Sequence, residues 1–367
     1  MKLALVVPGG VDRGGEYRVI PVLIGLLRQL SVHHEVHVFA LRQEPVAGSW
    51  KLAGATIHNI GTDTLSLRAL REILHEHRRA PFAMVQSIWS GRCGAIALVA
   101  ARLLRLPCLV HVAGGELVGL PDIDFGGQLS LRGRISESVV LPRADVVSAA
   151  SAPMIATLAK LGIRAETVPL GVDLDTWPVR PPERRTGGPM RLIQIASLNR
   201  VKDQPTLLRA VARLHASGVP VALDLVGEDT LGGEMQRLAV QLGVESCVRF
   251  LGYLPQRQLR QYVEAAHLCV VSSRHEAGPL ALLEAAIAGV PTVGTAVGHV
   301  DEWTPHAAHS VRVGDDAALA ETIRRLAVDE DGRLALAHAA QARAMAIDAR
   351  FTASRFCELY ERQARRA

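Results

Sequence analysis

Short apolar runs alternate with longer segments of helical period along nearly the whole chain, and this alternation restricts the possible folds more than any other feature. The runs are rich in Val, Ile and Leu at successive positions, which is typical of strands buried on both faces. Strands of this kind, with helices between them, form parallel sheets that helices cover on both sides. The sequence therefore predicts an α/β fold.

The alternation occurs twice along the chain. The strands expected in the first half are Leu3–Val7, Glu35–Ala40, Thr56–Ile60, Met84–Ser87, Cys108–Val112, Asp145–Ala149 and Glu166–Pro169, with helices at Arg18–Leu30, Leu65–Arg78, Gly94–Leu104 and Met154–Leu161. The strands expected in the second half are Leu192–Ala196, Val221–Val226, Val248–Leu251, Leu268–Val271 and Thr292–Val293, with helices at Gln204–Ser217 and Leu280–Ala288. The tail from Asp315 to Arg366 has helical period throughout, in about three pieces.

Between the two halves the pattern stops at VRPPERRTGGP, residues 179–189, which is rich in Pro, Gly and charge. Such a segment is typical of a domain linker. We therefore expect a Rossmann-like domain over residues 1–178, a linker over 179–189 and a second Rossmann-like domain over 190–349. Parallel sheets bind ligands at the carboxyl ends of their strands, so the two domains are expected to face one central cleft.

Composition excludes several functional classes. The 367 residues suffice for two domains, and the net charge of +5, without a long basic tract, argues against a nucleic-acid partner. The first apolar run ends at Pro8, too early for a signal peptide, and the apolar stretch Ala95–Val112 is interrupted by Arg102 and Arg105. The five scattered cysteines form no CxxC pair, which favours reduced thiols in a cytoplasmic protein.

The segment from Ser272 to Gly298 carries the strongest chemical signal. Pro279 is expected at the first position of a helix, where its missing N–H costs nothing. The free N–H groups at such a helix start favour a phosphate. Glu276 precedes the helix, and Glu284 lies roughly 7.5 Å further along its axis than Pro279. Two carboxylates on either side of a diphosphate could accept hydrogen bonds from the hydroxyls of a sugar and a ribose.

The motif EAGPLALLE at 276–284, followed by AAIAGVPTVGTAVG, resembles the donor-sugar region of retaining glycosyltransferases of family 4, the group 1 transferases with a GT-B fold. Further segments similar to that family follow in the expected order: VPGGVDRGGEYR at 7–18, PLGVD at 169–173, IASLNRVKDQPTLLRA at 195–210, FLGYLP at 250–255 and FTASRFCELYERQ at 351–363. The resemblance implies that residues 350–367 form a helix that crosses back to the N-terminal domain.

The resemblance also implies roles for residues of the second half. Lys202 would hold the donor diphosphate, Glu276 the transferred hexose and Glu284 the ribose. Ser197 stands where the family has an arginine, and either Ser197 contributes a hydroxyl or Arg200 supplies the charge. The remaining donor contacts are expected from the backbone near the base and at the helix start, at Leu254, Gly278, Leu280 and Ala281.

In the first half the resemblance is looser. Gly14 and Gly15 match a glycine pair whose backbone approaches the diphosphate, and His111 matches a histidine near the reacting sugar. We also expect Glu116 and Arg18 to contact the acceptor. The acceptor pocket is expected from the loops 9–18, 87–92 and 114–127.

The predicted activity is transfer of a hexosyl group from a UDP- or GDP-sugar to a hydroxyl of a glycan, lipid-linked or small-molecule acceptor, with retention and without a metal or other cofactor. A monomer or weak homodimer is expected. Two alternatives stay open, a nucleotide-sugar epimerase and a non-catalytic nucleotide-sugar binding protein. A glycan phosphorylase needs a pyridoxal-binding lysine near the C-terminus, and no lysine follows Lys202.

Some other patterns are interpreted as non-functional. Asp122 and Asp124 form an Asp-x-Asp without supporting ligands, and the histidine pairs His33–His34 and His306/His309 lack partners at metal spacing. A basic helix face is expected to be solvated, although peripheral docking on anionic lipid at the cytoplasmic face of the membrane stays open. That face comprises Arg68, Arg71, Arg78 and Arg79.

Overall fold

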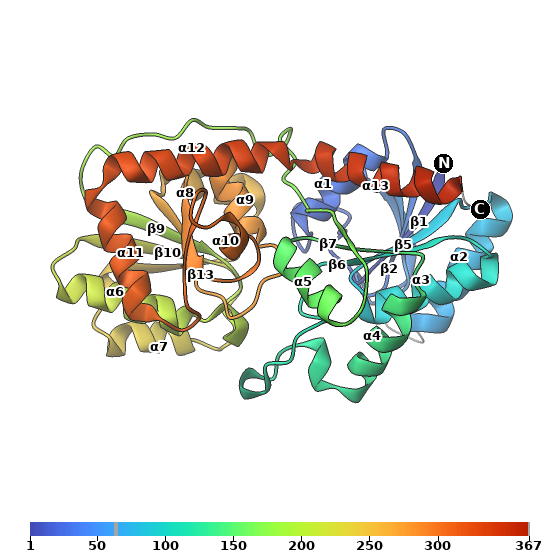
Figure 1. The fold of residues 1–367 in the computed structure, drawn as a ribbon, viewed down its shortest axis with the longest axis horizontal. Helices are drawn as coiled ribbons and strands as arrows, with labels where there is room; N and C mark the ends of the chain where they lie inside the picture. Colours follow the sequence, from blue (N-terminus) through green and yellow to red (C-terminus); the bar gives the residue numbers. More distant parts are fainter. Residues whose placement is uncertain (62–64, 366–367) are drawn as a thin grey trace. The chain divides into compact units, whose positions relative to one another are not determined.

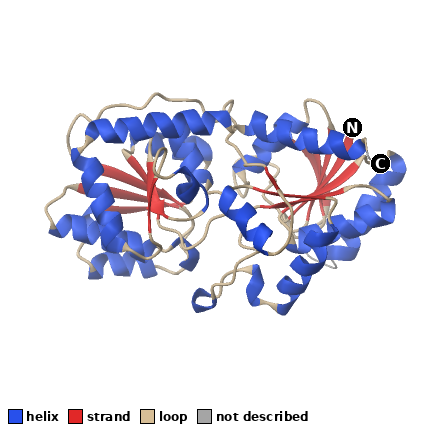
Figure 2. Cartoon of the chain, viewed as in Figure 1, coloured by secondary structure: helices blue, strands red, loops and turns tan. Residues whose placement is uncertain are grey.

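The computed structural model describes residues 1–61 and 65–365, which fold as two compact units. The first unit comprises Met1–Asp173 and the chain from Ile347 onward, and the second comprises Leu174–Ala346. Each unit is built on a sheet flanked by helices (Figures 1 and 2). The α/β class predicted from the alternating pattern is therefore confirmed.

The first unit contains the N-terminal sheet. Its strands are β1 (Lys2–Val7), β2 (Glu35–Ala40), β3 (Gly48–Leu52), β4 (Ala55–Asn59), β5 (Met84–Ile88), β6 (Cys108–Val112), β7 (Val146–Ala149) and β8 (Glu166–Thr167). Its helices are α1 (Pro21–Leu30), α2 (Leu65–Arg79), α3 (Gly91–Leu104), α4 (Leu131–Arg143), α5 (Ala152–Lys160) and α13 (Ala349–Ala364), with 3₁₀ turns at Pro121–Ile123 and Gly127–Leu129.

The strand order of this sheet is β3-β4-β2-β1-β5-β6-β7-β8. All described pairs are parallel except β3 with β4, which form an antiparallel hairpin at one edge. Strand β1 is central, with Leu5 opposite Val38 on one side and Gln86 on the other. The chain moves outward from β1 in one direction and from β5 in the other, so the switch point of the topology lies between these two strands.

The final helix, α13, belongs to this first unit and packs on α1, which confirms the expected return of the C-terminal helix. Thr352 anchors it by donating to the carbonyl of Pro169 at 2.7 Å and accepting from the N–H of Gly171 at 2.9 Å. A Cβ on Gly171 would lie 1.9 Å from the carbonyl oxygen of Ile347, so only glycine permits this approach. Phe356, fully buried, extends the core cluster of the sheet into the helix.

The second unit contains the C-terminal sheet. Its strands are β9 (Met190–Ile195), β10 (Val221–Val226), β11 (Val248–Gly252), β12 (Leu268–Val271), β13 (Thr292–Thr295) and β14 (His309–Val311). Its helices are α6 (Gln204–Ala216), α7 (Glu234–Gln241), α8 (Gln256–Ala265), α9 (Leu280–Ile287), α10 (Gly298–Trp303), α11 (Asp316–Val328) and α12 (Glu330–Ala346), with 3₁₀ turns at Arg200–Lys202 and Glu245–Cys247.

The strand order of the second sheet is β11-β10-β9-β12-β13-β14, and its described pairs are parallel. Its switch point lies between β9 and β12, so the loops after these two strands are where a ligand is expected. The core on one side of this sheet is aliphatic, formed mainly by Leu and Val side chains of β9, β10, α6 and α11. The expected helical tail is found as α11, α12 and α13.

Several helix starts differ from the predictions: α3 begins at Gly91 and not at Gly94, and α5 begins at Ala152 and not at Met154. Helix α1 begins at Pro21 and not at Arg18, because Arg18 has a left-handed backbone (φ 52°) and Val11 pairs with Val19 as an isolated bridge. Pro279 is the residue before α9, with an extended backbone (φ −66°, ψ 115°), and Leu280 is the first helical residue. The expected first position for Pro279 is therefore wrong by one residue.

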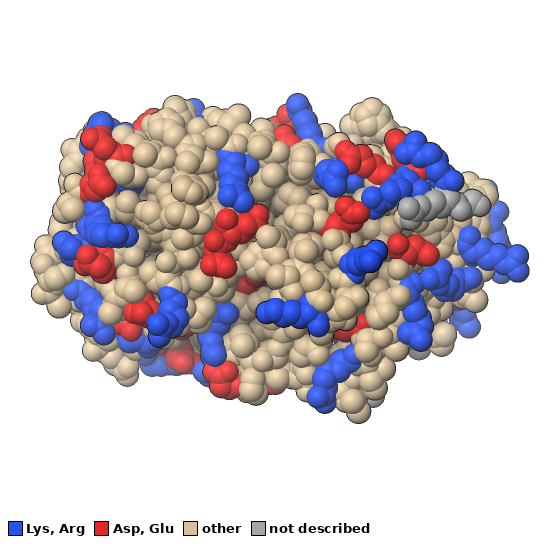
Figure 3. Space-filling model, viewed as in Figure 1, with Lys and Arg blue, Asp and Glu red and all other residues tan. Residues whose placement is uncertain are grey.

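The helices and the charged side chains bear on possible contact with a membrane. Within residues 1–61 and 65–365, no helix combines the length and apolar character needed to cross a bilayer. On the face shown in Figure 3, basic and acidic side chains are interspersed.

Candidate active site

In the second unit, the loops after β9 and β12 meet at the switch point of the sheet. The Nζ atom of Lys202 lies 2.6 Å from Oε1 of Glu276, which also accepts a hydrogen bond from the hydroxyl of Ser273 at 2.6 Å. The backbones are joined as well, because the Ser272 hydroxyl donates to the carbonyl of Lys202 at 2.8 Å and the Arg274 N–H donates to Val201. The structure thus brings Lys202 and Glu276 together across 74 positions of sequence.

The lysine and the glutamate are accessible without being fully solvated. The side chain of Lys202 is 25% exposed and that of Glu276 is 13% exposed. Asn199 fixes the turn before Lys202, since its side chain accepts the Lys202 N–H at 3.1 Å. An ammonium group held in this way can meet an anion at the mouth of the loop while its partner carboxylate keeps it oriented.

Helix α9 starts beside this pair. The start of the helix is partly buried at Gly278, Leu280 and Ala281. The cap residue is Pro279, whose side chain makes no hydrogen bond to the first N–H groups of the helix. The positive end of the helix dipole and these amides face the loop that carries Glu276. Backbone donors and a lysine at one helix start suit a diphosphate.

Glu284 lies on α9 and is buried, with 3% of its surface exposed. Burial raises its pKa to about 7, an effect opposed by the side chain of Gln256, which donates to Oε1 of Glu284 at 2.8 Å. The backbone carbonyl of Glu284 accepts the indole N–H of Trp177 at 2.8 Å. A carboxyl group that titrates near neutral pH can either accept from or donate to a ribose hydroxyl.

The other donor candidates of this unit take different positions. Ser197 is partly buried, and its carbonyl accepts from the side chain of Gln204 at 3.2 Å. Arg200 is 60% exposed on its side chain and lies 3.6 Å from Glu234 of α7. Leu254 is partly buried in the loop between β11 and α8. In this structure Arg200 is thus paired with a surface carboxylate.

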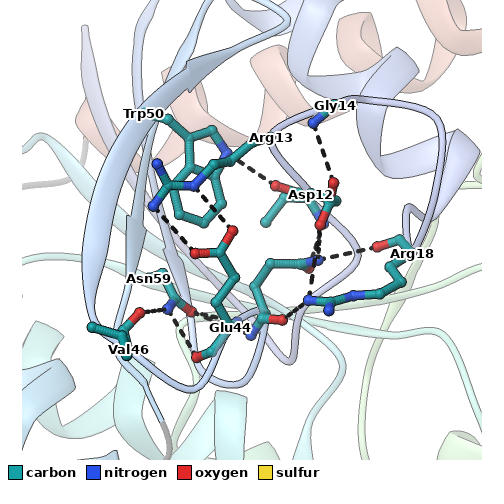
Figure 4. Close-up of polar contacts among 10 residues, drawn as sticks. Asp12, Arg13, Gly14, Arg18, Glu44, Val46, Trp50 and Asn59 are labelled. Carbon is teal, nitrogen blue, oxygen red and sulfur yellow. Dashed lines mark hydrogen bonds and ion pairs between the residues drawn. The ribbon is translucent and has the colours of Figure 1, made fainter.

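In the first unit, the glycine loop after β1 is fastened to the segment after β2 (Figure 4). Oε1 of Gln43 accepts the N–H of Val11 at 2.9 Å, and its amide nitrogen donates to Asp12 and to the carbonyl of Arg18. The N–H groups of Gly14 and Gly15 both donate to Asp12, at 3.2 Å and 3.0 Å. The two amides expected to reach a diphosphate therefore have partners within their own loop.

Two arginines of this loop also have partners on the same segment. Arg18 donates to the carbonyl of Gln43 and lies 3.8 Å from Asp12. Arg13 forms an ion pair with Glu44 at 3.0 Å and stacks over the ring of Trp50, with 4.6 Å to its centroid (Figure 4). The guanidinium of Arg18 remains 59% exposed, so it is available to a ligand at this edge.

His111 lies in β6 and is completely buried. Its Nδ1 is 3.0 Å from the hydroxyl of Ser148, and its ring meets Phe356 of α13 edge to face, with 5.5 Å between centroids. Burial lowers the pKa of His111 to about 3, so the imidazole is neutral at physiological pH. The structure places this residue in the core of the first unit.

Glu116 joins the loops after β5 and β6. Its Oε1 accepts the N–H of Ser90 at 3.1 Å, and its Oε2 accepts the N–H of Gly114 at 2.7 Å. Burial raises the pKa of Glu116, and the hydrogen bonds oppose this. Glu137 of α4 accepts a hydrogen bond from the adjacent residue of the loop after β5. It is 4% exposed, and its Oε1 accepts the N–H of Gly91 at 2.9 Å.

A buried group with metal-ligand side chains lies elsewhere in the first unit. Atoms of His37, His58 and Glu76 lie within 4.8 Å of one another. His37 and His58 are hydrogen-bonded at 2.9 Å, and Glu76 is already paired with Arg79 at 3.2 Å and with Lys2 at 3.8 Å. These hydrogen bonds and ion pairs explain the group as a polar network between α2 and the sheet, without a metal ion.

Comparison with known proteins covers both units. A model of the glycosyl transferase 4-like domain matches residues 19–172, and a model described as glycosyl transferases group 1 matches residues 175–343. The chain belongs to the group 1 family of glycosyl transferases. The family that the EAGPLALLE motif suggested is therefore confirmed.

Curated relatives of this group 1 chain have different activities. A D-inositol 3-phosphate glycosyltransferase of Catenulispora acidiphila is 34% identical over 288 residues, 68% of this chain and 66% of the relative. One of Corynebacterium jeikeium is 29% identical, over 62% of this chain and 60% of the relative. A glycogen synthase of Mycobacterium tuberculosis is 27% identical over 351 residues, 92% of this chain and 80% of the relative. The chain thus spans less than two thirds of the length of the two inositol phosphate enzymes.

Solved structures agree on the fold. Sucrose-phosphate synthase of Thermosynechococcus elongatus covers all of this chain with a TM-score of 0.81 and 18% identity. The HepE protein of Anabaena, in complex with UDP-glucose, covers 98% of this chain and 99% of its own with a TM-score of 0.77 and 18% identity. The GT-B fold that the motifs implied is therefore confirmed.

The sequence analysis missed Glu137 and did not single out Trp89, although the expected acceptor loop 87–92 contains it. Glu137 and Trp89 lie beside Glu116, Trp89 as the residue that follows β5. The start of α3 is held by Glu137, 46 positions after Gly91, and the cap residue Ser90 makes no side-chain capping bond. No local pattern signals a cap supplied from so far along the chain. Trp89 lies two residues after the expected strand Met84–Ser87, and this place beyond a strand end is the signal that could have identified it.

Proposed function

We propose that this group 1 transferase moves a hexosyl group from a nucleotide-diphosphate sugar to an acceptor hydroxyl, with retention at the anomeric carbon. The observation that carries the proposal is the Lys202–Glu276 pair at 2.6 Å beside the open start of α9. An ammonium and backbone amides suit the diphosphate, and the carboxylate suits the hydroxyls of the hexose. The diphosphate and the hexose are thus bound by different groups. The bond that breaks, between the anomeric carbon and the diphosphate oxygen, would lie between these groups.

Charge stabilisation would provide most of the rate. When the bond to the anomeric carbon breaks, negative charge grows on the departing diphosphate. We propose that Lys202 and the amides of Leu280 and Ala281 stabilise this charge from fixed positions, so that little reorganisation accompanies the reaction. Since the group that departs carries the anionic oxygens, we propose that one of them accepts the proton of the attacking hydroxyl on the same face, which gives retention.

The remaining donor contacts follow from the second unit. We propose that Glu284 binds the ribose hydroxyls and that the backbone at Leu254 faces the base. Ser197 offers only its hydroxyl, and we propose that Arg200 is not its substitute, because Arg200 pairs with Glu234 in the structure. Metal-independent transfer is proposed because Lys202 and the helix start supply the positive charge that a divalent cation would otherwise bring.

Residues of the first unit have positioning roles in this proposal. His111 supports the strand end from within the core, and the glycine loop with Gly14, Gly15 and Arg18 forms one wall of the acceptor site. The hydrogen bonds of Asp12 and Gln43 keep this loop in one conformation. Glu116 holds the opposite wall by joining Ser90 to Gly114.

A donor panel tests the proposal. UDP-glucose is the first donor to test, because HepE binds it in the same fold. The full chain is incubated with UDP- and GDP-hexoses, with and without excess EDTA, and released UDP or GDP is measured against bound donor. Slow donor hydrolysis that persists in EDTA supports the proposal. Binding of a donor without any release would instead identify a non-catalytic binding protein, and release lost in EDTA would contradict metal independence.

A further inference from the structure

We infer that the acceptor of this enzyme is an uncharged sugar or polyol and that Trp89 forms the platform on which its ring stacks. The inference rests on the proposed function and names the class of its second substrate. It depends on what lies at the carboxyl ends of β5 and β6 in the first unit.

Trp89 stands at the switch point of the N-terminal sheet. The glycine loop follows β1 and Trp89 follows β5, the two strands between which the topology reverses. A crevice between the loops that follow two such strands is where open parallel sheets bind their ligands. Trp89 is partly exposed, whereas Trp177 and Trp303 are each only 1% exposed. Part of the Trp89 side chain is therefore accessible at the edge where the acceptor is expected, while the rest packs against the core.

The position of the indole is tightly held. Trp89 has a left-handed backbone (φ 72°), which is uncommon for a bulky residue. Its backbone N–H donates to the backbone carbonyl of His111 at 2.8 Å. A Cβ on Gly114 would lie 3.2 Å from Cδ1 of Trp89, so the ring packs directly against the backbone of the next loop. A ring fixed in this way can stack on the C–H face of a sugar with little loss of side-chain entropy.

The start of α3, next to Trp89, is closed to anions. A free helix start commonly binds phosphate through its first N–H groups. Here the N–H of Ser90 donates to Glu116 and the N–H of Gly91 donates to Glu137. The two carboxylates therefore occupy the N–H groups of Ser90 and Gly91, two of the donors that a phosphate would use here.

The same two glutamates also make the local charge unfavourable for a phosphate. Burial raises the pKa of both Glu116 and Glu137, and each carboxylate further raises the cost of a second negative charge nearby. Arg92 and, in the glycine loop, Arg18 are exposed, so solvent screens their charges. An uncharged hydroxyl group, in contrast, adds no charge beside these carboxylates.

Matched ligand pairs that differ by one phosphate test the inference. The probes are methyl α-D-glucopyranoside with its 6-phosphate and myo-inositol with its 3-phosphate. Saturation-transfer NMR on the full chain with UDP present measures binding of each. We expect transfer to at least one uncharged member and at least tenfold weaker binding of its phosphate. Equal or tighter binding of the phosphates, or no binding of either uncharged probe, overturns the inference.

Variants assign the binding to Trp89 and the charge effect to the glutamates. For the uncharged probe that binds, Trp89→Leu is expected to raise the Kd at least tenfold, and Trp89→Phe less than threefold. Glu116→Gln is expected to strengthen binding of the phosphorylated probe, whereas Glu358→Gln, which removes an exposed charge on α13, leaves both probes unchanged. A Kd unaltered in Trp89→Leu, at an unchanged melting temperature, removes Trp89 from the site. Donor hydrolysis by the unaltered protein is measured separately, so failure of the proposed function is distinguished from failure of this inference.

Discussion

Lys202 and Glu276 form a hydrogen-bonded ion pair of 2.6 Å at the point where the loops after β9 and β12 meet. The pair joins the residue that would hold the diphosphate to the residue that would hold the hexose. A partly exposed pair of this kind adds little to stability, since solvent screens it and side-chain entropy opposes it. Its importance lies in the orientation that each group gives the other.

Replacement of Lys202 tests this relationship. Lys202→Ala is expected to lower kcat for donor hydrolysis by about 10²- to 10³-fold, the usual loss when a preorganised charge-stabilising donor is removed. The melting temperature should change little, because the pair is partly exposed. Release of UDP from UDP-glucose, followed by a coupled assay, measures the effect.

Arg200→Ala is the matched control, because it removes an equal charge from the same 3₁₀ turn. Arg200 is 60% exposed and faces Glu234, so we expect less than a threefold change in kcat/KM. Near-normal transfer by Lys202→Ala, or an equal loss in both variants, would contradict the assigned role of Lys202.

The pH dependence of stability tests the environment of Glu284. Its pKa is about 7 in the folded chain against 4.5 when unperturbed, so between these values the folded state binds a proton that the unfolded state has lost. The contribution of Glu284 to the free energy of unfolding should therefore fall as pH rises from 4.5 to 7, by about 3 kcal/mol at about 1.4 kcal/mol per pKa unit. Glu284→Gln should remove this fall. Urea unfolding of both proteins across this range measures the difference, and parallel curves would show that Glu284 is not protonated when folded.

Much of the fold could be predicted from the sequence because most strands are continuous runs of Val, Ile and Leu, and burial on both faces gives that pattern directly. Strand β3 was missed. It lies at the sheet edge in an antiparallel hairpin, and residues 48–52 alternate between partly buried and exposed, so no apolar run marks it. The start of α1 was predicted too early because no sequence pattern indicates the left-handed backbone of Arg18.

The donor site was predictable because its sequence motifs lie in loops that the sheet topology places next to each other. The loops that carry Lys202 and Glu276 follow neighbouring strands, so their approach follows from the strand order once the sheet is known. The partners of Val11 and His111 were not predictable, since Gln43 and Ser148 become their neighbours only through loop and strand packing. Periodicity reports which face of an element is buried and not which polar atoms meet there.

The anchoring of α13 predicts a large stability effect far from the donor site. Phe356 is fully buried against the first sheet and touches His111. Phe356→Ala should lower the free energy of unfolding by about 3–5 kcal/mol, as expected when a buried aromatic ring is removed, whereas Phe356→Leu should cost less because it leaves a smaller cavity. Chemical denaturation provides the measurement. A loss below 1 kcal/mol for the alanine variant would mean that α13 is not part of the folded core.

His111 separates a positioning role from a catalytic one. Its folded pKa of about 3 lies below the usual 6.5, so its contribution to stability is complete above pH 6.5 and is lost as pH falls toward 3. His111→Gln cannot acquire this charge and keeps a polar group near Ser148, so its unfolding free energy should vary less with pH between 6.5 and 4. We expect kcat/KM of the variant to fall less than tenfold at neutral pH, since the imidazole is buried and reaches no solvent. A loss of a thousandfold or more in kcat, with an unaltered melting temperature and an unaltered acid sensitivity, would instead show that His111 touches the reacting sugar.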